Sequence, residues 1–249
     1  MDDRGQYMEN YTYTDIAWEF LRRNKDYIRD WKNLGRVKSG EEHVKRFLEV
    51  RQNENDLLAE KKWGILKFID PDNSNPSNVF WSPRLSKKST RIIFSQSGSC
   101  SWENIFENTR VQHKKLILHD NSLCIKIFNN HEYFQFFIDA PVQINKRSQF
   151  YIYVPLTLNN DCCNKCAAVI NGILNNKSKS SAKESRHHKL LATIDSMNKG
   201  LSHREIASHL FGEKAVEKEW SSDSWLRAKL RYRIKKANEL INFGYYDYL

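Results

Sequence analysis

The stretches SHREIASHLFG (202–212) and WLRAKLRYRIKKANELINF (225–243) decide the fold of the C-terminal part of this chain. The second stretch carries apolar residues spaced four, four, three and four apart, which are Leu226, Leu230, Ile234, Ala237 and Ile241. This spacing is typical of one buried stripe on an α-helix. It predicts a long helix from about Trp225 to Phe243, with Asp223 in front of it as a cap residue.

The first stretch predicts a second helix that follows a tight turn. Apolar residues recur at helical spacing from Leu190 to Met197, and Gly200 ends that earlier helix. Ser202 then stands at an N-cap position, where its hydroxyl can accept a hydrogen bond from a free backbone N–H. A short helix follows and ends at Gly212, so the pattern as a whole predicts a helix-turn-helix.

Cationic side chains occupy the rest of the long helix, with no acidic residue between them. Two short helices that brace a long cationic helix suit the major groove of DNA, which admits one α-helix. We therefore expect DNA contacts from this helix and from polar residues near the helix starts: Ser202, Arg204, Ser222, Ser224, Arg227, Lys229, Arg231, Arg233, Lys235 and Lys236. The alternative is a solvated helix face that binds nothing.

The composition agrees with a polyanionic partner. The chain has 249 residues and a formal net charge of +10, which favours nucleic acid. An AT-rich genome, which inflates Lys and Asn, is the alternative cause of that charge. The chain opens on the polar residues Met1–Arg4 and has no apolar run of membrane length, so we expect a cytoplasmic protein without membrane contact.

The N-terminal part is expected to be mainly helical. Residues 13–31 are aromatic and helical, with Thr14 or Asp15 as the cap and a break expected near Asn24. A more polar helix is expected over 41–59, followed by a strand over 62–70 that ends at a proline. In the loop that follows, Phe80 and Trp81 are expected to anchor the loop to a core.

The middle of the chain is rich in short β-strands. They are expected at 91–94, 115–118, 123–128, 133–138 and 150–154, with a hairpin turn over 119–122. A helix over 164–174 and a linker over 175–185 follow. The expected fold class is α+β, with an N-terminal helical and strand region (1–87), a small antiparallel sheet with a helix (88–182) and the helix-turn-helix-like unit (183–249).

Two sets of residues carry a resemblance to a known family. The N-terminal set is AWEFLRRN (17–24) followed by Tyr27, Trp31, Trp63-Gly64, Asp70-Pro71 and Trp81. The C-terminal set is HREIA (203–207), Leu210-Phe211-Gly212, Trp220, Leu226-Arg227, Arg231, Arg233 and GYYDYL (244–249). Through these residues the chain resembles the two-domain transcriptional regulator-like proteins of proteobacterial integrative and conjugative elements.

The resemblance implies an activator of excision-factor transcription, because that is the role of the fused two-domain form. A free copy of the C-terminal domain in that family can antagonise by protein contact. This chain has Lys229, Lys235 and Lys236 where the family is Arg-rich, and Asp247-Tyr248 where it often has Arg or Leu. Because Lys is a point charge rather than a planar fork, bidentate guanine contacts are not expected from those lysines.

Catalytic and metal motifs are sparse. A CxxC is present at Cys163 and Cys166, but structural zinc needs four ligands and no second pair stands at suitable spacing, so we expect reduced thiols, no metal and no cofactor. His43 and Arg46 fit the HxxR box of a tyrosine recombinase but lie too near the N-terminus. We expect no enzyme, and a recombination enzyme stays a distant alternative.

Arg22 and Arg23 leave two possibilities open. They could contact phosphate, or they could pair with Glu19 or Asp26 on their own helix. The expected function is a DNA-binding transcriptional regulator, an activator of mobile-element excision or transfer genes. The alternative is an interaction protein that works as anti-activator or co-regulator. Double-stranded DNA is the expected partner, with RNA polymerase, another regulator and a second copy of the chain as further candidates.

Overall fold

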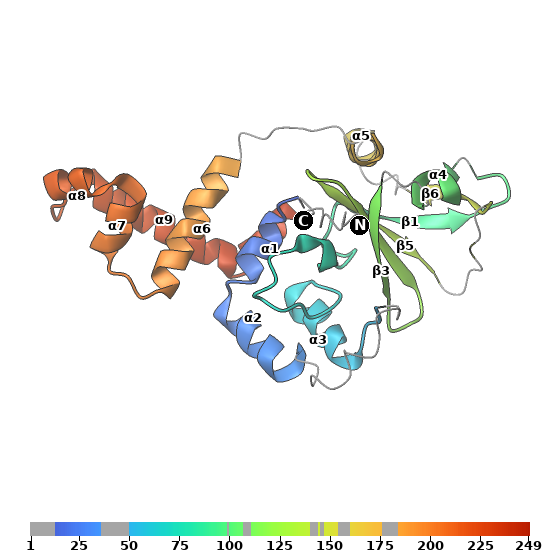
Figure 1. The fold of residues 1–249 in the computed structure, drawn as a ribbon, viewed down its shortest axis with the longest axis horizontal. Helices are drawn as coiled ribbons and strands as arrows, with labels where there is room; N and C mark the ends of the chain where they lie inside the picture. Colours follow the sequence, from blue (N-terminus) through green and yellow to red (C-terminus); the bar gives the residue numbers. More distant parts are fainter. Residues whose placement is uncertain are drawn as a thin grey trace, which may run out of the picture.

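The computed structural model of this chain describes residues 13–35, 50–98, 100–106, 111–139, 144, 147–153, 160–175 and 184–249, without the side chains of 160–163 and 184–186. A β-sheet forms one end of the molecule, helices α7, α8 and α9 form the other, and the N-terminal helices lie between them (Figure 1). The expected α+β class is confirmed.

Two short helices and a π-helical turn open the described chain. They are α1 (Ile16–Leu21), α2 (Lys25–Asp30) and η1 (Trp31–Gly35). The carboxylate of Asp15 caps α1 by accepting a hydrogen bond from the backbone N–H of Trp18. The amide oxygen of Asn24 caps α2, so this residue divides the aromatic stretch into two helices as expected.

Helix α3 (Glu54–Trp63) is displaced from the predicted positions. A reciprocal capping box between Asn53 and Asp56 starts it, and Gly64, at a φ of 74°, ends it. The predicted helix over 41–59 is therefore only partly found, and residues 41–49 lie outside the described chain. The predicted strand over 62–70 is wrong: its first two residues complete α3, and Ile65 makes a single bridge to Trp81.

Within the described residues, six strands form one sheet. They are β1 (Ser89–Phe94), β2 (Cys100–Ser101), β3 (Gln112–Ile117), β4 (Leu123–Phe128), β5 (Tyr133–Ile138) and β6 (Gln149–Tyr153), in the order β2-β6-β1-β5-β4-β3. The expected hairpin over 119–122 joins β3 to β4, with Asn121 in the left-handed region at φ 64°.

The sheet is mixed, so the expected antiparallel sheet is wrong. Strand β1 runs parallel to β5, with Ser89 opposite Gln135, while the other pairings are antiparallel. The cause is a crossover: the chain leaves β1, builds β2, α4 (Trp102–Phe106) and the β3–β4 hairpin, and returns through β5 beside β1. Strand periodicity cannot reveal such a crossover because it carries no information on partner direction.

Both faces of the sheet are covered at its centre. One face packs on α4 and α5 (Asn160–Leu174), and its core includes Phe106, Phe136 and Ile173. The other face packs on the N-terminal part through Leu66, Phe80 and Phe137. Since β4 and β5 are buried on both sides, they are apolar almost throughout rather than alternating.

Two buried polar side chains fasten the N-terminal loop to the sheet. The side chain of Gln135 accepts from the backbone N–H of Trp81 at 2.9 Å and donates to its carbonyl at 2.8 Å. The ammonium of Lys126 donates to the carbonyls of Pro76, at 3.0 Å, and Val79. Phe80 and Trp81 are buried, so the expectation that they anchor the loop is confirmed.

Four helices and a 3-10 turn complete the chain: α6 (Glu184–Asn198), α7 (His203–Phe211), α8 (Glu213–Glu219), α9 (Trp225–Ile241) and η4 (Gly244–Tyr248). Helix α8 was not predicted, because its sequence is polar and Val216 is its one buried residue. Helix α6 begins at the end of the predicted linker, of which residues 176–183 lie outside the description. The cap residue of α9 is Ser224, not Asp223.

The first and last segments of the chain share one hydrophobic core. Tyr245 is fully buried and its hydroxyl donates to the carbonyl of Trp63 at 3.0 Å. Leu249 and residues of α6 and α9 lie in the same cluster as Trp18 and Phe20. The described residues of the predicted segments 1–87 and 183–249 therefore contribute to one hydrophobic core.

Candidate nucleic-acid interface

A small separate core holds the outer ends of the C-terminal helices together. Ile206 and Ala207 of α7, Val216 of α8, and Leu226 and Leu230 of α9 are buried against one another. This core fixes the first turns of α9 against α7, as the amphipathic pattern predicted, and against α8, which was not predicted. The later turns of α9 pack instead on α6 and the N-terminal part, where Ala237 and Leu240 are buried.

The serines at the helix starts act as caps. The hydroxyl of Ser202 accepts from the N–H of Glu205 at 3.3 Å, and the Glu205 carboxylate accepts from the N–H of Ser202 at 2.7 Å. Hydrogen bonding of the Glu205 carboxylate with the Ser202 side chain, and with the Ser202 backbone N–H, lowers the pKa of Glu205. Ser224 accepts from the N–H of Arg227, and the Ser222 hydroxyl donates to Asp223. Arg204 is exposed on the first turn of α7.

The cations of α9 do not lie on one face. An α-helix turns by about 100° per residue, so residues two apart point about 200° apart. Arg231 and Lys235 therefore share one side of α9, and Lys229 and Arg233 share nearly the opposite side. The cations of α9 that are predicted to contact DNA are therefore divided between two sides of the helix.

Lys229 and Arg233 lie over aromatic rings. The guanidinium of Arg233 is 4.7 Å from the ring centre of Phe211, and the ammonium of Lys229 is 5.6 Å from the same ring and 5.2 Å from that of Trp225. Burial lowers the pKa of Arg233. Its Nη1 is buried, and no described residue accepts a hydrogen bond from it. Arg227 lies in the same manner 5.6 Å from the ring of Trp220.

Arg231 and Lys235 line a shallow groove on the other side of α9. The groove measures about 610 Å³ and runs between the start of α7, at His203, and α9, where Ile234, Asn238, Glu239 and Asn242 complete it. Lys236 differs from the other cations because it pairs with Glu239 at 3.3 Å. The groove joins the first turn of α7 and the exposed cations of α9 into one surface.

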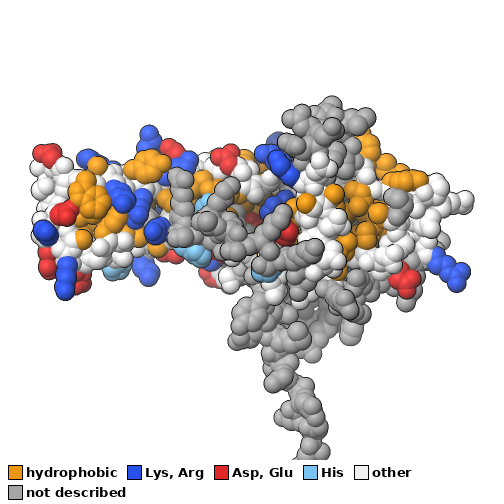
Figure 2. Space-filling view, turned by 90° about the horizontal axis from the view of Figure 1, so that it is seen from above, with side chains coloured by type: hydrophobic (Ala, Val, Ile, Leu, Met, Phe, Trp, Pro, Cys, Tyr) orange, Lys and Arg blue, Asp and Glu red, His pale blue; other side chains and the backbone are white. Residues whose placement is uncertain are grey.

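Exposed aromatic side chains lie between the two cationic sides of α9. Trp225 is 54% exposed and Tyr232 is 59% exposed, and Ala228 is exposed between them. At the end of the molecule formed by α7, α8 and α9, hydrophobic atoms lie among Lys and Arg side chains (Figure 2). Ala228 and Tyr232 were not among the predicted site residues, although their spacing of four opposite the apolar stripe makes their exposure visible in the sequence.

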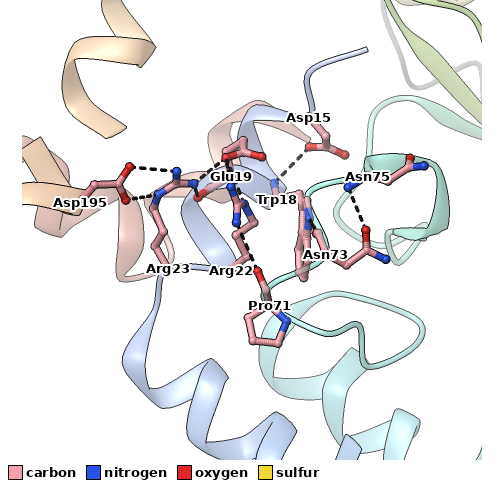
Figure 3. Close-up of polar contacts among 9 residues, drawn as sticks. All are labelled: Asp15, Trp18, Glu19, Arg22, Arg23, Pro71, Asn73, Asn75 and Asp195. Carbon is pink, nitrogen blue, oxygen red and sulfur yellow. Dashed lines mark hydrogen bonds and ion pairs between the residues drawn. The ribbon is translucent and has the colours of Figure 1, made fainter. Parts of the chain in front are cut away.

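Arg22 and Arg23 are bound within the protein. Arg23 pairs with Asp195 of α6 through two hydrogen bonds of 2.6 and 3.1 Å, and with Glu19 at 2.5 Å (Figure 3). Burial lowers the pKa of Arg23, but these hydrogen bonds outweigh that effect and raise it. Arg22 pairs with Glu19 and donates to the carbonyl of Pro71. Of the two open possibilities, pairing with Glu19 is found, and the contact with Asp195 was not foreseen.

Another cavity lies at the opposite end of the molecule. It measures about 550 Å³, and its lining combines the apolar Leu66 and Phe137 with Arg84, Arg91 and His119. Across the described residues, no three His, Cys, Asp or Glu side chains come together as metal ligands would. Cys162, Cys163 and the HxxR segment 43–46 fall outside the described side chains, so the expectations about them stay predictions. None of the described helices could span a bilayer.

Two family matches coincide with the two ends of the chain. Residues 2–66 match the Proteobacterial transcriptional regulator-like domain, and residues 167–249 match the RovC DNA-binding domain, described as "T6SS, Transcription factor, DNA binding domain". No curated protein matches the chain. The second match covers all of α6 to α9. Together with the cationic surface of α9, these matches identify a DNA-binding transcriptional regulator.

Proposed function

We propose that this protein is a sequence-specific activator of transcription that binds double-stranded DNA through the first turns of α9. In this proposal it is not an enzyme, and it acts in the cytoplasm, where bacterial DNA lies. One observation carries the proposal: from Trp225 to Asn238 the helix has no acidic residue and projects cations on two sides of an exposed face. Cations arranged in this way attract the phosphates that flank a DNA groove.

Activation requires more than DNA binding, and the N-terminal part supports it. This part matches a regulator-like domain and holds α6 through the Arg23–Asp195 pair, so the orientation of the DNA-binding helices depends on it. The resemblance to regulators of integrative and conjugative elements favours excision or transfer genes as targets. RNA polymerase is then the partner that the activator would contact at the promoter.

An interaction protein is the second candidate, and an exposed face of the sheet favours it. Ile93 of β1 lies opposite Tyr151 of β6, and Tyr153 lies opposite Arg91. Ile93, Tyr151 and Tyr153 are large hydrophobic residues that solvent reaches. Such a group is typical of a surface for another protein, which could be a second regulator or a second copy of this chain.

A gel-shift titration at two salt concentrations tests the first candidate. The wild type, the Arg231→Ala/Lys235→Ala double variant and a control, Lys87→Ala/Lys165→Ala, are compared on promoters of the neighbouring genes. The control removes two exposed lysines beside the sheet. We expect only the Arg231→Ala/Lys235→Ala variant to bind more weakly. The slope of its affinity against salt concentration should fall by the amount that corresponds to about two phosphate contacts. Wild-type protein that binds no DNA but captures a second regulator would favour the interaction protein.

A further inference from the structure

The exposed face of α9 divides into three strips. Taking Trp225 as the origin, and about 100° for each residue, Ala228 and Tyr232 lie within about 60° of it on one side. Lys229 and Arg233 lie on the other side, towards Phe211. Arg231 and Lys235 lie beyond Ala228, towards the groove at His203. Over the first three turns of α9 the outermost strip is therefore uncharged, and a pair of cations flanks it on each side.

The dimensions of this arrangement match the major groove of B-DNA. A helix with its side chains is about 10–12 Å across, and the major groove is about 12 Å wide. If the outer strip points at the base pairs, the two cationic pairs reach the phosphate rows on opposite sides of the groove. The rotation of α9 about its own axis is fixed, because Leu226 and Leu230 on its inner face are buried in the core with α7.

Only the first three turns of α9 are free to enter a DNA groove. Farther along, Ala237 and Leu240 are buried in the core shared with the N-terminal part, and Asn24 donates to the carbonyl of Ile241 at 3.0 Å. Glu239 brings the first acidic charge of this helix. The end of α9 that can enter DNA is therefore the segment from Trp225 to Lys235.

We propose that Ala228 and Tyr232 contact base edges in the major groove, while Lys229 with Arg233 and Arg231 with Lys235 contact the phosphates of opposite strands. This assignment rests on the proposed function and deepens it. A methyl group such as that of Ala228 suits the C5-methyl of thymine, and the Tyr232 hydroxyl can donate to or accept from a base edge.

The first experiment separates base contacts from phosphate contacts. A duplex site is selected with the wild type from a randomised library, and affinities for it and for a scrambled duplex are measured over a range of salt. For Tyr232→Ala we expect a loss of about tenfold on the selected site, little change on the scrambled duplex and an unchanged salt slope. For Lys229→Ala/Arg233→Ala we expect losses on both duplexes and a lower slope.

Folding of each variant is checked by its melting temperature, and Lys229→Ala alone replaces the double variant if Arg233 proves necessary for folding. Equal losses on both duplexes for Tyr232→Ala would overturn the base-contact assignment. Unchanged slopes for Lys229→Ala and the double variant would overturn the phosphate assignment. A wild type that enriches no sequence and binds neither duplex would instead show that the proposed function has failed.

The second experiment tests Ala228 through the DNA. Each thymine of the selected site is replaced in turn by deoxyuridine, which removes only the C5-methyl group. At one position we expect the wild type to lose affinity and Ala228→Gly to show a smaller loss, because the glycine variant has no methyl group to contact. Equal losses for the two proteins at every position would contradict the Ala228 contact.

Discussion

Arg23 and Asp195 are 172 residues apart in the chain, yet their side chains form a two-bond ion pair, with Nε–Oδ1 at 2.6 Å and Nη2–Oδ2 at 3.1 Å. This pair joins the N-terminal helices to α6 (Figure 3), and α6 in turn packs against α7 and α9. A bidentate Arg–carboxylate pair fixes orientation as well as distance. The two family-matched segments are therefore held together by directed contacts in addition to apolar packing.

The first prediction concerns the strength of this pair. In a double-mutant cycle with Arg23→Ala and Asp195→Ala, we expect a coupling free energy of about 1 kcal/mol, discounted because Asp195 is 45% exposed. Urea unfolding of the four proteins provides the measurement. The control cycle uses Arg29 and Asp26, which are 62% and 59% exposed and should couple by only about 0.3 kcal/mol. Equal coupling in the two cycles would contradict the prediction.

The second prediction concerns the C-terminal turn. Tyr245→Ala should lower the free energy of unfolding by about 3–5 kcal/mol, since a large, fully buried aromatic side chain is removed. Tyr245→Phe should cost only about 1 kcal/mol, which isolates the hydrogen bond to Trp63. The exposed Asp247 provides the matched control, because Asp247→Ala removes a side chain from the same turn without creating a cavity. A neutral Tyr245→Ala would show that the turn does not hold the two segments together.

The third prediction follows from that shared core. A fragment of residues 184–249 loses the partners of Leu190, Ile194 and Tyr245, which are buried against the N-terminal part. We expect it to lose cooperative thermal unfolding, measured by circular dichroism, and to bind DNA more weakly than the intact chain. A fragment that melts cooperatively at the temperature of the full protein would show instead that the core around Ile206 and Leu226 suffices.

The fourth prediction concerns pH. Burial lowers the pKa of Lys126 from 10.5 to about 7; the carboxylate of Asp15 raises it and the nearby charge of Lys88 lowers it further. Between those two values the unfolded chain holds a proton that the folded chain has released. The free energy of unfolding should therefore rise from about pH 7 to about pH 10.5, and the cost of burying the charge is fully present below pH 7.

Lys126→Met tests this assignment, because it removes the titrating group and keeps most of its volume. Urea unfolding from pH 6 to pH 10 should show a smaller rise for this variant than for the wild type. The exposed Lys114 on β3 is the control, since Lys114→Met should leave the pH profile unchanged. Parallel profiles for the wild type and Lys126→Met would mean that Lys126 keeps its ordinary pKa when folded.

The fifth prediction concerns the start of α7. Asp caps a helix about as well as Ser, so Ser202→Asp should keep the melting temperature. It should weaken DNA binding, because a carboxylate then lies on the helix that forms the groove with Arg231 and Lys235. Ser202→Asn provides the matched control, with a comparable cap and no charge, and should bind DNA as the wild type does. Normal binding by Ser202→Asp would place the start of α7 away from the phosphates.

The sequence by itself determined the local elements of the site. The apolar spacing in α9, Ser202 as a cap and Asn24 as a break are consequences of side chains acting on their own backbone within a few residues. Such effects depend on helical periodicity and on local hydrogen bonds, so they can be predicted without knowing the fold. The hairpin at Asn121 belongs to the same class, because a short polar residue tolerates the left-handed conformation.

The tertiary structure alone decided which residues act together. Parallel pairing of β1 with β5, the contact of Arg23 with Asp195 and the burial of Tyr245 on Trp63 each join residues far apart in the chain, and no local pattern records such partners. Lys62 and Trp63 lie in the last turn of α3, although their sequence is typical of a strand, because the helix ends only at Gly64. The charges of α9 and their angular spacing were visible in sequence, but the fold decided which side faces Phe211 and which side faces the groove at His203.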